Sequence, residues 1–133
     1  MNWKRAVMRG LAETASFVRR NRASCAGLRV LLYHSVSEQD AIGSEGLFCI
    51  KPDLFESHMI ALSKMSEVDF VTIQEGFSSI GRFGVAVSFD DGYKDNLYNA
   101  APILLDYNIP FTVFVSPVRI QSNDEKYLTP SEL

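Results

Sequence analysis

The 133-residue chain has few histidines, few cysteines and no long apolar run. Its two cysteines, Cys25 and Cys49, are too few and too ordinary in spacing to indicate a disulfide framework or a zinc knuckle. Its two histidines, His34 and His58, lie 24 residues apart, which excludes a compact pair of histidine metal ligands. No stretch approaches the roughly 20 apolar residues of a transmembrane helix.

Basic residues are concentrated at the start of the chain. Residues 1–27 carry six basic side chains and one acidic side chain, although the whole chain has a net charge of -3. Apolar residues recur there every three or four positions, which predicts an amphipathic helix with a cationic face. Such a helix could make peripheral contact with a membrane, or it could pack on the domain or be disordered. The segment lacks the apolar core of a secretory signal, so we expect a cytoplasmic or membrane-peripheral location.

The rest of the chain, residues 28–133, is predicted to be an α/β domain. Short segments rich in β-branched and aromatic residues predict strands at 29–33, 70–73, 85–89 and 111–115. Helical patterns follow at 52–65 and 97–105. Strand, helix and strand from 85 to 115 predict a right-handed βαβ unit and a parallel sheet. The sheet should be open, because a closed (β/α) barrel takes about 200 residues or more.

The helix predicted at 97–105 has one apolar face and one awkward residue. Leu97, Ala101, Leu104 and Leu105 fall at helical spacing and should cover the sheet. Pro102 lies inside this pattern. It either kinks the helix or marks its first turn, where proline is tolerated.

Two adjacent carboxylates, Asp90 and Asp91, follow the strand predicted at 85–89. Successive side chains of a strand point to opposite faces, so the pair can serve one site only if the chain turns there, and Gly92 can supply that turn. Neighbouring carboxylates repel unless they share a proton or bind a cation. With a metal, one aspartate could be a ligand and the other a general base. The alternative is a solvated acidic turn whose following helix is capped by Asp95 or Asn96.

The segment from Val85 to Pro117 contains FDDGY, NAAPILLDYNIP and FTVFVSP. It closely resembles the opening motif of the polysaccharide deacetylase family, also called the NodB homology domain or carbohydrate esterase family 4. LLYHSV at 31–36 and PDLFESHMIALSKM at 52–65 are similar to the lead-in of the branch acting on exopolysaccharides. The resemblance spans residues 28–133 and implies the amino-terminal part of a (β/α) barrel of the NodB type, open and incomplete in this chain.

The resemblance implies a metal-dependent polysaccharide N-deacetylase, a hydrolase acting on carbon–nitrogen bonds other than peptide bonds. By position, Asp90 matches the catalytic base and Asp91 the metal-binding aspartate. The metal would be divalent: zinc, or else cobalt, manganese or nickel. The family's later His-x-x-x-His pair, arginine motif and acid histidine do not appear, and residues 127–133 resemble the start of the helix before that pair. We therefore expect a truncated chain with an incomplete metal site and no activity by itself.

Further residues are predicted to line the site. His34 ends the strand predicted at 29–33 and could face the same edge as the two aspartates, or it could be a structural corner residue. Gly92, Tyr93 and Ser116 lie in loops at the carboxyl ends of strands, where sites form in parallel α/β folds. The polar loop at 37–46 could roof the site, whereas His58 lies in an amphipathic helix pattern and is expected to be structural.

Two other functions compete with deacetylation. A phosphoryl-transfer enzyme is less favoured, because no phosphate-binding glycine loop with a lysine is present. A non-catalytic glycan-binding or assembly module could use Tyr93, Tyr33 and Phe48 as sugar-stacking surfaces. The expected partner in the main interpretation is an N-acetylated polysaccharide or glycolipid. Nucleic acid is not expected, because the acidic body would repel phosphate, and self-association through the open sheet edge is expected.

Overall fold

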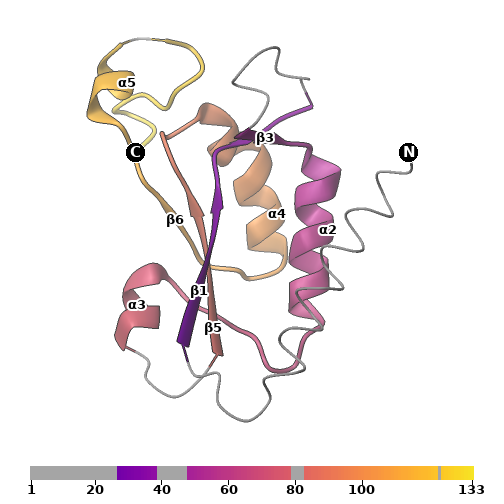
Figure 1. Cartoon of the computed structure of the whole chain (residues 1–133). Helices are drawn as coiled ribbons and strands as arrows, with labels where there is room; N and C mark the ends of the chain where they lie inside the picture. The colour runs from indigo at the N-terminus through magenta and orange to yellow at the C-terminus, as the bar shows by residue number, and fades with distance from the viewer. Residues whose placement is uncertain (1–26, 39–47, 79–82, 123) are drawn as a thin grey trace.

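The computed structural model describes residues 27–38, 48–78, 83–122 and 124–133 (Figure 1). Most of the basic segment at 1–27 and of the loop at 37–46 lies outside the described residues, so the expectations about them stay predictions. No helix in the described part of the chain has the length and hydrophobicity needed to cross a bilayer.

Four parallel strands form the main sheet, and they are β1 (Gly27–Tyr33), β4 (Asp69–Phe70), β5 (Phe83–Phe89) and β6 (Phe111–Val113). Strand β5 is central and is buried from residue 84 to residue 89. β1 pairs with it along its whole length. β4 and β6 therefore share the other edge of β5, β4 at its start and β6 at its end. The predicted open, parallel sheet is confirmed.

A second, two-stranded parallel sheet lies beyond the end of β1. It consists of β2 (Ser35–Val36) and β3 (Cys49–Ile50). The chain leaves β3 and enters helix α2 (Pro52–Ser63), which confirms the helix predicted at 52–65, with Pro52 in its first turn and an end two residues earlier. The short sheet thus connects the edge where β1 ends to the helical layer.

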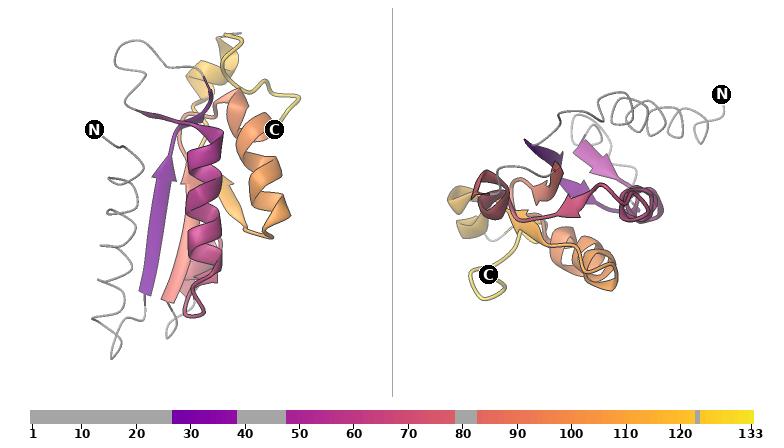
Figure 2. Two further views of the ribbon diagram at one scale, coloured as in Figure 1. Left: turned by 90° about the vertical axis from the view of Figure 1, so that its right-hand side faces the viewer. Right: turned by 90° about the horizontal axis from the view of Figure 1, so that it is seen from below.

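The core lies between one face of the sheet and a layer made of α2, η2 (Asn96–Ala100) and α4 (Ala101–Asp106). Both α2 and α4 lie on the same side of the sheet (Figure 2). Phe55 and Met59 of α2 and Leu104 of α4 pack with Val87 and Phe89 of β5, and all are fully buried. Burial of such side chains stabilises the fold by about 1.5–3 kcal/mol each.

Helix α3 (Ile73–Ser78) covers the start of the opposite face of the sheet. Its Gly76 lies so close to Leu28 of β1 that a Cβ there would come within 2.4 Å of a Leu28 methyl carbon. Thr72 and Glu75 bond reciprocally at its start: the Thr72 N–H donates to the Glu75 carboxylate at 2.9 Å, and the Glu75 N–H donates to the Thr72 hydroxyl at 3.2 Å. This capping box starts a helix, so the strand predicted at 70–73 is wrong beyond Phe70.

The apolar face predicted for residues 97–105 is partly wrong. Leu97 and Leu105 are 40% and 68% exposed, whereas Leu104 is fully buried. Leu97 lies within the π-helical turn η2, in which the Ala101 N–H bonds to the Asn96 carbonyl, whereas Leu105 lies after this turn, next to Leu104 in α4. A π turn contains one more residue than an α turn, so it rotates the following helix relative to the preceding residues. Pro102 lies in the first turn of α4, one of the two positions predicted for it.

One face of β1 carries exposed apolar side chains. Val30 is 46% exposed and Leu32 is 54% exposed. Among the described residues, no strand pairs with the edge of β1 that faces away from β5. Unpaired edges favour association with other chains, and self-association stays a prediction.

Replacing the buried leucine of α4 should cost far more stability than replacing its neighbour. We expect Leu104→Ala to lower the free energy of unfolding by about 2–5 kcal/mol, because it leaves a cavity in the core. Leu105→Ala, the matched control, should change it by less than about 0.5 kcal/mol. Urea unfolding followed by circular dichroism measures both values, and equal losses would contradict the orientation of α4, in which Leu104 is buried and Leu105 is exposed.

Candidate active site

The two predicted site aspartates lie where β5 ends, and the chain turns there. The Asp90 N–H donates to the Tyr33 carbonyl at 3.0 Å, which extends the pairing with β1 by one residue. Asp91 and Gly92 then have φ values of 72° and 70°. This turn ends the strand alternation, as the sequence predicted, and a non-glycine residue in this conformation costs about 1–3 kcal/mol. Both aspartates are half-buried, so neither lies in the hydrophobic core.

The turn packs against the loop that follows β6. A Cβ on Gly92 would lie 3.2 Å from a methyl carbon of Val115, and the Gly92 carbonyl accepts a hydrogen bond from the Leu128 N–H at 2.9 Å. Ser116, the next residue, precedes helix α5 (Pro117–Gln121), and its carbonyl accepts from the Ile120 N–H. The loops after β5 and β6 therefore meet at one edge of the sheet, as the βαβ prediction requires.

Asp91 forms an ion pair with Arg119 of α5. The Arg119 Nε and Asp91 Oδ1 atoms are 3.5 Å apart. The guanidinium lies over the ring of Tyr127, 4.9 Å from its centroid, and its Nη1 donates to the Tyr127 hydroxyl. Desolvation alone would lower the pKa of Arg119, but Asp91 and the two tyrosines nearby raise it. Arg119 was not predicted as a site residue from the sequence, although it lies three residues after Ser116 and so at the same sheet edge.

Tyr93 is packed against Tyr127. The two residues form an antiparallel bridge, and their ring centroids are 4.9 Å apart. Burial, followed by the hydrogen bond with Tyr127 and the charge of that residue, raises the pKa of Tyr93 to about 12. Tyr93 is therefore neutral at physiological pH and joins the Asp91 turn to the C-terminal segment.

His34 lies just after β1 and stacks on Phe48, with ring centroids 4.8 Å apart. Its carbonyl accepts a hydrogen bond from the Asn96 side chain at 2.6 Å. The Tyr33 ring is partly buried against Phe55 and Phe89 of the core. Its hydroxyl is hydrogen-bonded to the His58 Nδ1 at 3.1 Å, and burial raises the pKa of Tyr33 to about 12. The use of Tyr33 as a sugar-stacking surface is thus wrong, whereas the expectation of a structural His58 agrees with this contact.

Polar side chains fasten η2 to the segment that follows β1. The Ser35 hydroxyl donates to the Asp95 carboxylate at 2.6 Å, and the Asn99 amide donates to the Val36 carbonyl at 2.7 Å. Burial raises the pKa of Asp95, against the hydrogen bonds from Ser35 and the Val36 backbone, which lower it. Asp95 makes no side-chain cap on the following helix, so that part of the acidic-turn alternative is wrong.

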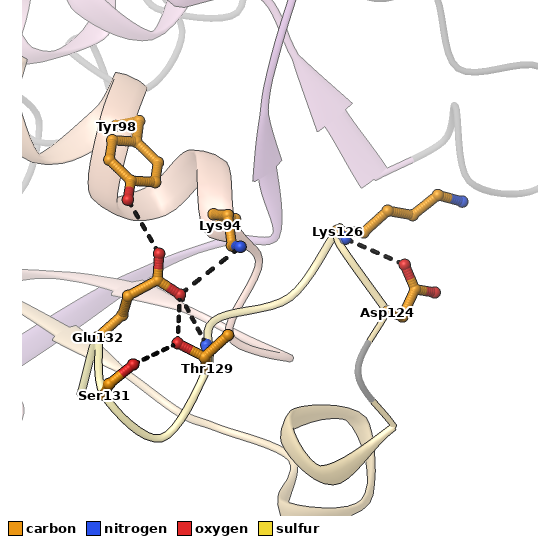
Figure 3. A network of polar contacts seen from close by, with 7 residues as sticks. All are labelled: Lys94, Tyr98, Asp124, Lys126, Thr129, Ser131 and Glu132. Carbon is orange, nitrogen blue, oxygen red and sulfur yellow. Dashed lines mark hydrogen bonds and ion pairs between the residues drawn. The ribbon is translucent and has the colours of Figure 1, made fainter.

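The C-terminal segment is fastened to η2 through Glu132 (Figure 3). Its carboxylate accepts from the Thr129 N–H at 2.8 Å, the Thr129 hydroxyl at 2.7 Å and the Tyr98 hydroxyl at 2.9 Å. Lys94 adds an ion pair at 3.7 Å. The bonds from Thr129, then that from Tyr98, and also the charge of Lys94 lower the pKa of Glu132 to about 2. A Glu132 side chain bonded back to Thr129 is typical of a helix amino terminus, although residues 130–132 form only a turn here.

The described residues do not by themselves fit a catalytic zinc site. Such a site has three protein ligands. Within the ranges that the structure describes, no three His, Cys, Asp or Glu side chains are grouped so that they could hold one metal ion. Asp91 is paired with Arg119, and the His34 ring lies against Phe48.

Removing the hydroxyl that donates to Asp95 should destabilise the fold. We expect Ser35→Ala to lower the free energy of unfolding at pH 7 by about 1–2 kcal/mol, because a partly buried carboxylate loses a donor. Ser57→Ala, the control, removes a hydroxyl bonded only to its own helix and should change stability by less than about 0.5 kcal/mol. Chemical unfolding measures both, and a harmless Ser35→Ala would mean that the Asp95 contact carries no stability.

Glu132 should make the stability of the fold depend on pH in the acidic range. Because its pKa falls from 4.5 to about 2 on folding, its contribution is fully present above pH 4.5 and is lost as the pH falls toward 2. Thermal unfolding between pH 2 and pH 6 should show a steeper fall for the wild type than for Glu132→Gln. Glu125→Gln, at an exposed position, should follow the wild type. Parallel curves for wild type and Glu132→Gln would contradict the assignment.

Comparisons with known proteins agree with the predicted family. Residues 80–132 match the sequence model described as polysaccharide deacetylase. A comparison with curated protein sequences found no match.

Solved structures with the same fold include the deacetylase PplD of Streptococcus pyogenes in complex with acetate, at 20% identity and a TM-score of 0.65. The others reported are IcaB of Ammonifex degensii, at 26% identity and 0.61, and BC0361 of Bacillus cereus, a polysaccharide deacetylase, at 26% and 0.62. The alignments cover 82%, 80% and 79% of this chain but only 51%, 46% and 34% of those structures. The predicted resemblance to the polysaccharide deacetylase family is therefore confirmed by the family model over residues 80–132 and by the fold, that of an open and partial NodB-type barrel.

Proposed function

We propose that this chain carries the first carboxylate motif of a polysaccharide N-deacetylase, which hydrolyses the N-acetyl amide of an amino sugar to a free amine and acetate. The observation that supports it best is the left-handed turn Asp91–Gly92, which follows Asp90 at the carboxyl edge of a sheet shared with solved deacetylases. This turn lies in the segment matched by the family model. Acetate, the product expected, is the molecule bound in the PplD structure.

Asp90 is the proposed general base. Its carboxylate would accept a proton from water while the water oxygen attacks the acetyl carbon. The tetrahedral intermediate would then lose the sugar nitrogen, which takes up a proton, so that the C–N bond is replaced by a C–O bond. Because the Asp90 N–H is bonded to Tyr33, the backbone of the base is fixed to the end of β1. A base held in this way can act without a costly search for the reactive position.

The family is generally metal-dependent, and we propose a divalent ion, zinc first, with Asp91 among its ligands. When bound, such an ion polarises a carbonyl and acidifies a water molecule. The described residues alone supply too few ligands, so we expect the isolated 133-residue chain to release acetate at close to the background rate.

The proposed substrate is an N-acetylated polysaccharide or glycolipid, and we propose a cytoplasmic or membrane-peripheral location. A non-catalytic glycan-binding role has less support than it had from the sequence. Of its three proposed stacking residues, Tyr33 packs against the core and Tyr93 packs against Tyr127. Phe48 is 55% exposed, but a single aromatic side chain does not make a sugar platform.

Replacing the base tests the proposal in a chimera, in which this chain takes the place of the aligned part of the Bacillus cereus deacetylase BC0361. We expect the chimera to release acetate from oligomers of N-acetylglucosamine in the presence of zinc or cobalt. Asp90→Asn should lower the rate by about 100-fold or more, because proton transfer by a positioned base contributes at least that factor.

Asp106→Asn, at an exposed position in α4, is the matched control and should keep the rate of the parent chimera. A chimera that folds, as judged by circular dichroism, but releases no acetate would contradict the proposal. Full activity of Asp90→Asn would contradict the role given to Asp90.

A further inference from the structure

Asp91 already has a cationic partner within the chain. We propose that Arg119 is a built-in counter-ion of Asp91 that a divalent metal ion must displace, so that this arginine limits the metal affinity of the site. The inference rests on the metal-binding role proposed for Asp91. It explains why the residue that the family resemblance assigns to a metal is paired with a guanidinium, at 3.5 Å, in this structure.

The backbone at Asp91 and Gly92 is held in one conformation by its surroundings. Asp91 and Gly92 both have positive φ values, and the space beside the Gly92 Cα is taken by Val115. The Leu128 N–H holds the Gly92 carbonyl from the C-terminal segment. The Asp91 carboxylate therefore depends on side-chain rotation to leave Arg119.

Arg119 is held from the other side by the same C-terminal segment. Its guanidinium lies over the Tyr127 ring and donates to the Tyr127 hydroxyl. Ile120, its neighbour in α5, is 8% exposed and anchors the helix. Stacking of a guanidinium on an aromatic ring stabilises by about 0.5–1 kcal/mol at exposed sites, so the arginine is favoured in this position even apart from its charge.

The charges around Arg119 favour its contact with Asp91. Tyr93 lies close to the pair, but its pKa is raised to about 12, chiefly by burial, so it is neutral at pH 7. Asp91 is thus the anionic group that Arg119 contacts in the described structure. A dication bound to Asp91 would lie beside the guanidinium, and like charges at such separations oppose binding. Either the arginine side chain swings away, which breaks its contact with Asp91, or the metal binds weakly.

The rival explanation is that Arg119 only fastens α5 to the Asp91 turn. In that case its removal would lower stability and leave metal affinity unchanged. Arg119→Met removes the charge and keeps most of the length of the side chain. Arg119→Lys keeps the charge but loses the planar group that stacks on Tyr127.

Manganese broadening of the Asp91 and Gly92 amide signals in nitrogen-15 NMR spectra measures metal affinity at this position, even when binding is weak. We expect the apparent dissociation constant for Mn²⁺ to fall by about three- to fivefold in Arg119→Met, which is the upper range for a partly exposed charge pair. Arg119→Lys should fall between Arg119→Met and the wild type. Asp91→Asn, added to Arg119→Met, should abolish the gain.

Lys94→Met is the matched control. Lys94 lies three residues after Asp91 in the chain, but its positive charge pairs with Glu132 and not with Asp91. The substitution should leave the dissociation constant within about twofold of the wild type, since charge contacts at a distance are screened by salt. Each variant is checked for a native-like spectrum before titration, and Arg119→Lys keeps the test open if Arg119→Met does not fold.

Equal affinities of Arg119→Met and wild type overturn the inference, whether both bind manganese or neither does. An equal gain in Lys94→Met also overturns it, because the effect would then be one of net charge. The outcome is separate from that of the proposed function: acetate release by the chimera tests deacetylation, and manganese affinity of the chain itself tests the counter-ion.

Discussion

The rest of the site depends on a backbone constraint, the left-handed conformation of Asp91 and Gly92 directly after β5. A strand would place the two neighbouring carboxylates on opposite faces of the sheet, and the turn removes that restriction. It also brings the Gly92 carbonyl to Leu128 and the Asp91 carboxylate to Arg119, so that the C-terminal segment closes over this edge of the sheet. The strain at Asp91 is offset by these contacts, and strain of this kind is found mostly at functional sites.

Behind the turn, the fold separates an apolar layer from a polar one. Phe55, Phe89 and Leu104 belong to the hydrophobic core between the helices and the sheet. Nearer the carboxyl edge, Asp95 and Asn96 reach across to the segment after β1 and hold it by hydrogen bonds. Partly buried polar contacts of this kind stabilise the fold and also fix one arrangement of the chain. These hydrogen bonds explain how the segment after β1 keeps its position at the edge of the site, although the two-stranded sheet β2–β3 beside it is short.

The sequence predicted the parts of the structure that follow from local patterns. Buried parallel strands such as β5 are continuous apolar runs, and the need for a turn at Gly92 follows from strand geometry. The apolar face of residues 97–105 could not be predicted in full, because the π turn at Asn96–Ala100 changes the register between Leu97 and α4, and a helical pattern in the sequence does not show such a turn. The partner of Asp91 was missed because it comes from a segment 28 residues later, and long-range ion pairs leave no periodic signal. The capping pattern at Thr72 and Glu75 was present in the sequence and overlooked.

Gly92→Ala is the substitution that acts most directly on the turn at Asp91 and Gly92. Alanine at a φ of 70° is strained, and its Cβ would press on Val115 at 3.2 Å. We expect urea unfolding of this variant to show a loss of about 1 kcal/mol or more in the free energy of unfolding. The Arg119 and Tyr127 signals in NMR spectra should also move, because the turn contacts the segments that carry these residues. An unchanged unfolding midpoint with unchanged Arg119 and Tyr127 signals would contradict the claim that this left-handed turn organises the site.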